Sequence, residues 1–240
     1  MVVTSIPMRT GLASIVVWSV AACGGGSLEP GAGNDAGRGT RTLAVEGIVR
    51  ASSRHVNADD GTDFDTELVV RVSAGNRSVA SGAVVVTSAT GKTSLTYHGD
   101  RWSGSAPGYD QVYVLDVVDG HDKVEGLRVD GPDIHVFSRP TEGEVVNATM
   151  PLRIDWSRDD RADAATLHAE NTGSLAISDT GSYSLAAGSL KSDKTDPREN
   201  TLRLTRTNRV VPSGAVAGSV WAVSIDNAIV VVAQPQGMPL

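Results

Sequence analysis

One stretch of the sequence concentrates carboxylates. Four aspartates lie within positions 57–67: Asp59, Asp60, Asp63 and Asp65. Clustered carboxylates beside backbone carbonyls are the ligands that a hard cation such as Ca²⁺ prefers. The spacing differs from that of an EF-hand, because Gly61 in the sixth place would put Val56 at the first ligand position. We therefore treat the four aspartates as a candidate calcium site, with a solvated acidic loop as the alternative.

Two aromatic residues form a second candidate site. Trp102 and Tyr109 lie in the stretch RWSGSAPGY (101–109), which is expected to form a loop. An exposed Trp/Tyr pair can stack on a sugar ring or anchor a protein contact. The alternative is that the tryptophan packs over the edge of its own fold.

Several catalytic motifs are present only in part. The tetrapeptide at 179–182, DTGS, matches an aspartic-protease active site, but that chemistry needs a second carboxylate and the sequence has no second Asp-Thr-Gly or Asp-Ser-Gly. The stretch TGKTS (90–94) resembles the end of a phosphate-binding loop, but Val86 stands where its glycine is required. Both stretches are expected to be turns. The histidines are scattered, and neither HExxH nor GxSxG occurs, so the sequence does not predict an enzyme.

Composition excludes some partners and cofactors. Among 240 residues there are 21 Lys and Arg against 28 Asp and Glu, a net charge of −7. Nucleic-acid binding rests on neutralising phosphates, so nucleic acid is not an expected partner. The one cysteine, Cys23, excludes an intramolecular disulfide and a Cys-rich zinc site. No cofactor is expected, apart from the calcium left open above.

The N-terminus has the pattern of an export signal. Arg9 precedes an uncharged, mostly apolar run over 12–22, which is shorter than the roughly 20 residues needed to span a bilayer. The run ends in VAAC, at Val20, Ala21, Ala22 and Cys23. This ending resembles the lipobox of bacterial lipoproteins. The alternative is a signal peptide cut at an Ala-x-Ala-like site, with Cys23 as a free thiol.

The lipobox resemblance implies a location. It implies that residues 1–22 are a signal peptide that is removed, and that Cys23 carries the lipid anchor of a cell-envelope protein. Gly24, in place of aspartate, points toward the outer membrane under the enterobacterial sorting rule. Residues 23–40 are rich in glycine and poor in apolar side chains, so they are expected to form a flexible tether.

The rest of the chain reads as strands. From Leu43 onward, short runs rich in Val, Ile, Thr and Leu alternate with Gly, Asp, Asn and Pro, a pattern typical of all-β sandwiches or barrels. The pairs Asp119-Gly120 and Asp226-Asn227 are expected to be hairpin turns. The stretch 159–170 is expected to be a short helix at most.

Two further stretches suggest sandwich families. The segments PTEGEVV (140–146) and PLRIDWS (151–157) resemble the opening strands of bacterial immunoglobulin-like modules. The segment SDTGSYSLAAG (178–188) is similar to the turn and strand of carboxypeptidase-regulatory-like, or transthyretin-like, sandwiches. These resemblances imply two β-sandwich domains, over 41–138 and 139–240.

The sequence favours a non-enzymatic cell-envelope lipoprotein. Its sandwiches would serve as a structural spacer or as a module that binds an envelope protein or a glycan, with the membrane contacted through the N-terminal lipid. The alternative is a surface hydrolase whose site is built from loop carboxylates such as Asp59, Asp63 and Asp65, with or without calcium.

Overall fold

The computed structural model describes residues 28–234. Within this range the chain forms strands and connections with one short 3-10 turn, η1 (Gly61–Asp63), so the predicted all-β class is confirmed. No helix in the described range is both long and apolar enough to cross a membrane. The strands are β1 (Asp35–Gly39), β2 (Ala44–Ser53), β3 (Phe64–Ala74), β4 (Arg77–Ser78), β5 (Ala83–Ser88), β6 (Gly91–Ser94), β7 (Thr96–His98), β8 (Arg101–Pro107), β9 (Val112–Asp119), β10 (Asp122–Asp130), β11 (Phe137–Arg139), β12 (Val145–Val146), β13 (Leu152–Trp156), β14 (Ala164–Ala169), β15 (Gly173–Ile177), β16 (Ser182–Leu185), β17 (Arg198–Val210) and β18 (Val220–Ala233).

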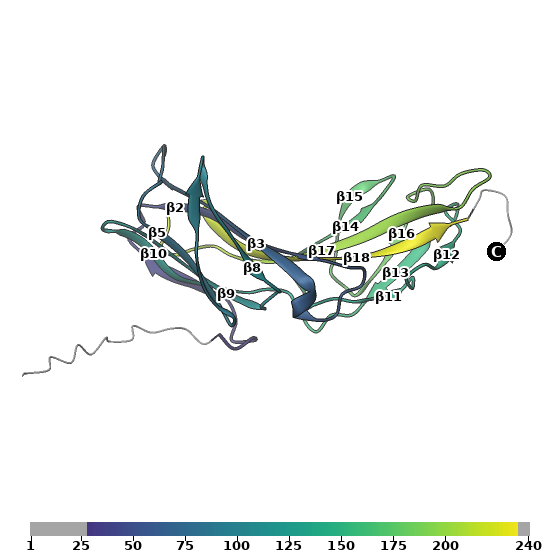
Figure 1. The fold of residues 1–240 in the computed structure, drawn as a ribbon, viewed down its shortest axis with the longest axis horizontal. Helices are drawn as coiled ribbons and strands as arrows, with labels where there is room; N and C mark the ends of the chain where they lie inside the picture. The colour runs from purple at the N-terminus through teal and green to yellow at the C-terminus, as the bar shows by residue number, and fades with distance from the viewer. Residues whose placement is uncertain (1–27, 235–240) are drawn as a thin grey trace, which may run out of the picture.

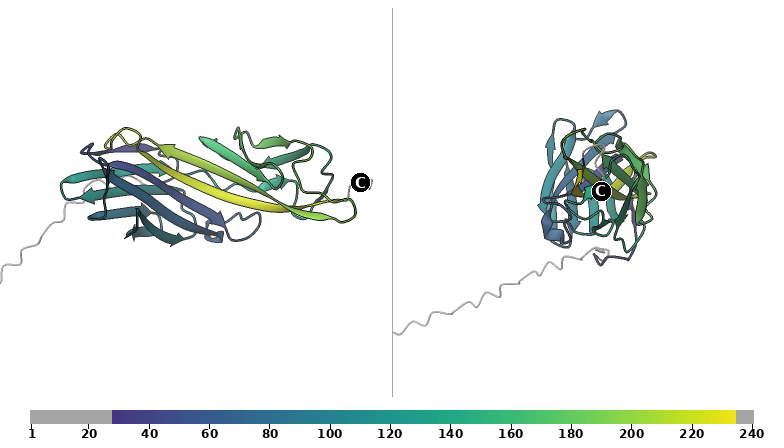
Figure 2. Two further views of the ribbon diagram at one scale, coloured as in Figure 1. Left: turned by 90° about the horizontal axis from the view of Figure 1, so that it is seen from above. Right: turned by 90° about the vertical axis from the view of Figure 1, so that its right-hand side faces the viewer.

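The last two strands form a ribbon that runs through the whole molecule. β17 pairs with β18 in antiparallel fashion from Val210↔Trp221 to Arg198↔Ala233. The other edge of β18 pairs in parallel with β2 over Val220–Asp226 and with β12 at its far end. The ribbon therefore belongs to one sheet of ten strands that extends along the long axis (Figure 1; Figure 2, left).

Alternation along β18 explains how one strand serves two cores. Successive side chains of a strand point to opposite faces, so every second residue shares a face. On the inner face these residues are Trp221, Val223, Ile225, Asn227, Ile229, Val231 and Ala233. The first three belong to one hydrophobic core and the last three to another. Asn227, the polar residue of the series, lies between the two cores and is fully buried.

Each core is closed by a separate second sheet. Over the first core, the sheet β1-β10-β9-β5-β6 faces the part of the long sheet made by β18, β2, β3, β8 and β7. Over the second core, the three-stranded sheet β11-β13-β16 faces β15, β14, β17 and the second half of β18. The molecule thus consists of two sandwiches built against the same face of one sheet, with a waist between them (Figure 1).

The structure differs from the sequence prediction at several places. The stretch 101–109, expected as a loop, contains strand β8, and most of the expected turn at 90–94 is strand β6. Asp226-Asn227 is not a hairpin turn, because β18 continues through both residues. At this point Asp226 pairs with Thr205 of β17 on one side and with Ser52 of β2 on the other. The stretch 159–170, for which a short helix was left open, forms no helix, and its second half is strand β14. The flexible tether predicted over 23–40 is not free along its whole length, because Asp35–Gly39 form β1, which pairs with β10. The boundary at 138/139 does not separate two closed units, since Trp221, Val223 and Ile225 return to the first core.

Candidate functional site: a buried polar junction and a shallow groove

The structure does not gather the four aspartates of the acidic loop into a metal site. The Asp60 Oδ1 atom accepts hydrogen bonds from the Thr62 backbone N–H and hydroxyl, both at 2.8 Å, and these bonds lower the pKa of Asp60. Asp63 Oδ2 lies 3.3 Å from His55 Nε2, and Asp65 Oδ1 lies 3.9 Å from Arg54 Nε. Asp59 is exposed. Within residues 28–234 no group of three or more His, Cys, Asp or Glu side chains is placed to hold a metal ion, so the calcium hypothesis gains no support.

Trp102 and Tyr109 are core residues rather than an exposed pair. Trp102 is 6% exposed, donates from Nε1 to the Val79 carbonyl at 2.9 Å, and packs edge-on against Tyr97. Tyr109 is 8% exposed and donates its hydroxyl to the Pro132 carbonyl at 2.6 Å. Because burial removes both ring faces from solvent, the hypothesis that this pair binds a ligand is corrected.

The DTGS stretch supplies a structural carboxylate. Asp179, in the connection between β15 and β16, is buried and accepts hydrogen bonds from Trp156 Nε1 at 3.0 Å, the Ala162 amide at 2.8 Å and Arg206 Nε at 3.0 Å. Burial by itself raises the pKa of Asp179, but these donors and the Arg206 charge together hold it below the ordinary value. The carboxylate is therefore ionised at neutral pH and committed to the fold.

Arg206 binds oxygen atoms from several connections at the waist, the region between the two cores. This β17 residue is fully buried, and its Nη1 atom lies 2.9 Å from the Asp133 carbonyl and 3.1 Å from Asp133 Oδ1. Its Nη2 atom lies 3.0 Å from Asp179 Oδ2 and also donates to the Asp160 carbonyl. One guanidinium thereby ties together the linker after β10 and the connections that follow β13 and β15. A buried arginine with this many acceptors is stabilised by the fork geometry of its donors.

His135 is a second buried polar residue of the junction. Its Nε2 atom lies 2.9 Å from the Leu204 carbonyl, and a carbonyl can only accept, so Nε2 carries the proton. Burial, aided by the nearby Arg206 charge, lowers the pKa of His135 to about 4. The imidazole is therefore neutral at neutral pH.

Two asparagines close the junction. Asn227 donates from Nδ2 to the carbonyls of Ala58 at 2.8 Å and His135 at 2.7 Å. Asn57, whose φ of 51° lies in the left-handed region that asparagine tolerates, pairs through its side-chain amide with both backbone groups of Phe137. These contacts join the β2–β3 connection, the linker and the ribbon.

Sequence reasoning missed the junction, although a signal was present. Arg206 follows Leu202 and Leu204 on the inner face of β17, just as Asn227 interrupts the apolar inner face of β18. A polar residue on an otherwise apolar face indicates either a turn or a buried hydrogen-bonded site. Only the pairing of both strand edges distinguishes the two.

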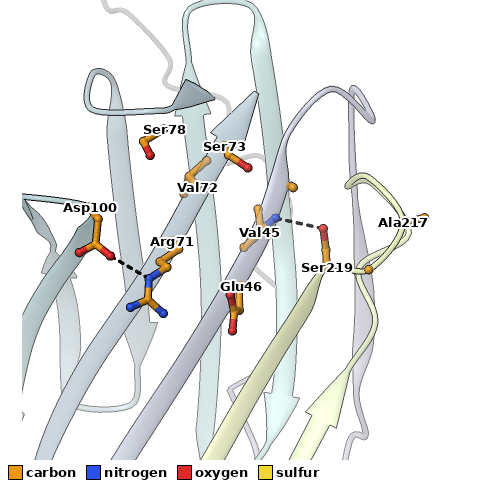
Figure 3. Close-up of a pocket in the computed structure, with 11 residues that line it drawn as sticks. Val45, Glu46, Arg71, Val72, Ser73, Ser78, Asp100, Ala217 and Ser219 are labelled. Atoms are coloured by element: carbon orange, nitrogen blue, oxygen red, sulfur yellow. Dashed lines mark hydrogen bonds and ion pairs between the residues drawn. The ribbon is translucent and has the colours of Figure 1, made fainter. Parts of the chain in front are cut away.

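A shallow groove of about 340 Å³ lies on the outer face of the first sandwich, near its tip (Figure 3). Its ionisable side chains are Glu46, Arg71 and Asp100, and Arg71 Nε lies 3.2 Å from Asp100 Oδ2. Arg71 and Asp100 have about half or more of their side-chain surface exposed, so their ion pair is screened by solvent. The groove therefore offers polar contacts at an open surface.

Comparisons with known proteins do not assign this chain to a family. The chain matches no protein-family model and no curated protein. Among solved structures, one described as the crystal structure of DIP-gamma IG1+IG2 aligns with 80% of this chain and 97% of that chain, at 8% sequence identity and a TM-score of 0.23. The two-sandwich description therefore rests on the strand pairing and the two cores of this chain.

Proposed function

We propose that this protein is a non-enzymatic lipoprotein of the bacterial cell envelope, anchored through Cys23, whose paired sandwiches form a stiff elongated spacer that presents its surfaces to an envelope protein or a glycan. The observation that carries the proposal is the β17–β18 ribbon, which contributes to both cores without interruption.

The ribbon is an argument for stiffness. Domains joined by a simple linker are expected to move relative to each other unless their interface is large. Here a bend at the waist would break the ladder between β17 and β18 and expose Arg206 and Asn227, both fully buried. Such a loss is costly because buried polar groups left without partners are strongly unfavourable. A body of this kind suits a spacer or a display module.

The hydrolase alternative draws less support. It needs loop carboxylates that converge, whereas Asp63 and Asp65 are each engaged by a neighbouring basic side chain and Asp60 caps η1. The groove beside Arg71 holds a solvent-exposed ion pair.

Stiffness is tested by spin-label distances across the waist. Labels would be placed at Lys92→Cys in the first sandwich and Met150→Cys in the second, in a chain that also carries Cys23→Ser. We expect one narrow distance distribution, as wide as that of the control pair Lys92→Cys and Asn76→Cys within the first sandwich. A broad or two-peaked distribution across the waist would show a hinge and contradict the proposal.

The anchor and the partner need their own tests. Cys23 lies outside the described residues, so its lipidation is measured as the mass of the mature chain and its partition into detergent, with Cys23→Ser as the control. Capture from envelope extract by the mature lipoprotein, with and without calcium, then tests for binding. Recovery of one stoichiometric protein or glycan supports the module, whereas turnover in a broad hydrolase panel without a partner would favour the alternative.

A further inference from the structure

The segment Glu29–Gly39, here called the strap, is bound to the body along its length. Its second half is β1, which adds an antiparallel strand to the edge of β10 from Asp35↔Arg128 to Gly39↔Val124. Besides Pro30, the apolar side chains of the strap are the alanines at positions 32 and 36. Its position is therefore determined by backbone hydrogen bonds and close packing rather than by a hydrophobic anchor.

Two β10 residues form hydrogen bonds with the first half of the strap. Asp130 Oδ2 accepts hydrogen bonds from the amides of Gly31 at 2.9 Å and Gly33 at 3.0 Å. Arg128, only 5% exposed, donates to the carbonyls of Gly33 at 2.9 Å and Glu29 at 2.6 Å. Arg128 Nη2 also lies 2.6 Å from Asp130 Oδ1. Burial of an arginine beneath this segment indicates a built site for the strap.

The connection between β17 and β18 closes the other side of the strap. The Ser213 amide donates to the Ala36 carbonyl at 2.9 Å, and the Ser213 hydroxyl donates to the Gly37 carbonyl at 2.6 Å. A Cβ atom at Gly39 would lie 2.3 Å from the Lys123 carbonyl oxygen, and one at Gly214 would lie 2.1 Å from the carbonyl carbon of Arg38. Only glycine therefore fits at position 39 of the strap and at position 214 of the connection that packs against it.

The strap enters the body at the waist. Asp130 ends β10 next to the linker between the sandwiches, and its carbonyl accepts from Asn208 Nδ2 of β17 at 2.8 Å. From Gly31 and Gly33 beside Asp130, the strap runs along β10 toward the outer tip of the first sandwich. Figure 1 shows the described chain beginning near the middle of the long axis.

We propose that the strap ties the lipid anchor to the waist, so that the body is held side-on to the membrane with both tips free. This inference rests on the proposed lipidation of Cys23. With the strap docked, the five residues after Cys23 span at most about 17 Å, whereas a released strap would let seventeen residues, up to Thr40, reach about 58 Å. The strap thus limits how far the body can stand from the bilayer.

Docking of the strap is tested without the lipid, by hydrogen exchange on the full chain with Cys23→Ser. The variant Gly39→Val is compared with Ala32→Val, which adds bulk at an exposed strap position. We expect the amides of Gly31, Gly33, Thr40 and Arg41 to exchange at least tenfold faster in Gly39→Val only, while β18 keeps its protection in both. Strap amides that exchange freely in the unmodified chain would overturn docking. Arg128→Gln provides a second variant if Gly39→Val also lowers β18 protection.

Side-on attachment is tested with the mature lipoprotein in phosphatidylcholine vesicles that carry a headgroup energy acceptor. Donor dyes are placed at Asn76→Cys or Met150→Cys, in turns that follow β3 and β12 at opposite tips. We expect similar transfer from both tips, and at least a twofold loss from both in Gly39→Val. Much higher transfer from one tip, or no effect of Gly39→Val, would overturn the proposal. A chain that carries no lipid would fail to float with the vesicles, and this result would contradict the lipidation of Cys23. Docking of the strap would still be decided by the hydrogen-exchange experiment.

Discussion

The two sandwiches share one ribbon but are assembled differently. Of the described residues, 25 form the buried core of the first sandwich and 15 that of the second. The second sandwich uses a continuous stretch of chain, from β11 to β18. The first is built from β1–β10 and then needs the opening half of β18, including the fully buried Trp221. The larger sandwich is therefore the one that cannot be completed by its own part of the sequence.

The largest expected effect follows from this asymmetry. A fragment covering 28–138 lacks β18, so β2 loses its partner along Glu46–Ser52 and the core loses Trp221, Val223 and Ile225. We expect this fragment not to fold, as shown by a far-ultraviolet circular dichroism spectrum without the strand signal. The fragment 137–240 retains all of its core and is expected to keep strand structure. Independent folding of 28–138 would show that the ribbon is dispensable for the first sandwich.

Removal of the charge at the waist is expected to have the next largest effect. Arg206→Ala leaves the buried carboxylate of Asp179 without its ion pair, and breaking a buried pair costs about 3–5 kcal/mol of unfolding free energy. Arg198→Ala is the matched control on β17, because its ion pair with Asp193 is open to solvent and is expected to contribute far less. Denaturant unfolding measures both, and equal losses would contradict a structural role for the waist.

Acid is expected to weaken the waist through His135. Its pKa is about 4 in the folded protein against 6.5 as the ordinary value, so the unfolded chain takes up a proton first as the pH falls. The contribution of His135 to the unfolding free energy is fully present above about pH 6.5. This contribution is lost as the pH falls from about 6.5 to 4, and the loss is on the order of 3 kcal/mol.

The measurement is the unfolding free energy of the unmodified chain and of His135→Gln at pH 7 and pH 4.5. The variant is expected to lose less stability over this interval. The lowered pKa of Asp179 adds a separate loss only below its ordinary value of 3.8, outside the interval. Parallel curves for the two proteins would rule out a buried neutral imidazole.

The acidic loop is expected to show the smallest effect. Asp60→Ala removes the cap of η1 and is expected to lower the melting temperature only slightly, because the capped turn is short and exposed. Because the aspartates do not converge, millimolar calcium is expected to leave the melting temperatures of both proteins unchanged. A rise in melting temperature with calcium that Asp60→Ala or Asp63→Asn abolishes would restore the metal hypothesis.

Local patterns predicted the class of this fold but not its connections. Alternating Val, Ile and Leu residues indicated strands, and the Asp119-Gly120 pair does form the turn between β9 and β10, with Gly120 at a φ of 62°. Asp226-Asn227 carries the same type of turn signal but lies within β18. The ladder with β17 and the side-chain bonds of Asn227 outweigh the local preference for a turn.

The candidate sites show the same limit. Trp102 and Tyr109 are residue types that suit either a core or a binding surface, and the sequence does not specify which atoms surround them. The glycines of the strap are likewise compatible with a flexible tether or with close packing. Gly39 is required because the Lys123 carbonyl lies in the space that a side chain would fill.

By itself, the sequence determined the all-β class, the absence of any complete catalytic motif, and the apolar faces that form the cores. These follow from properties of neighbouring residues, such as alternation and turn preference. Only the tertiary structure decided that one ribbon serves both sandwiches, that Arg206 and Asp179 meet at the waist, and that the strap is docked. Each of these depends on a contact between distant parts of the chain, where the geometry of the partner determines the role of a residue.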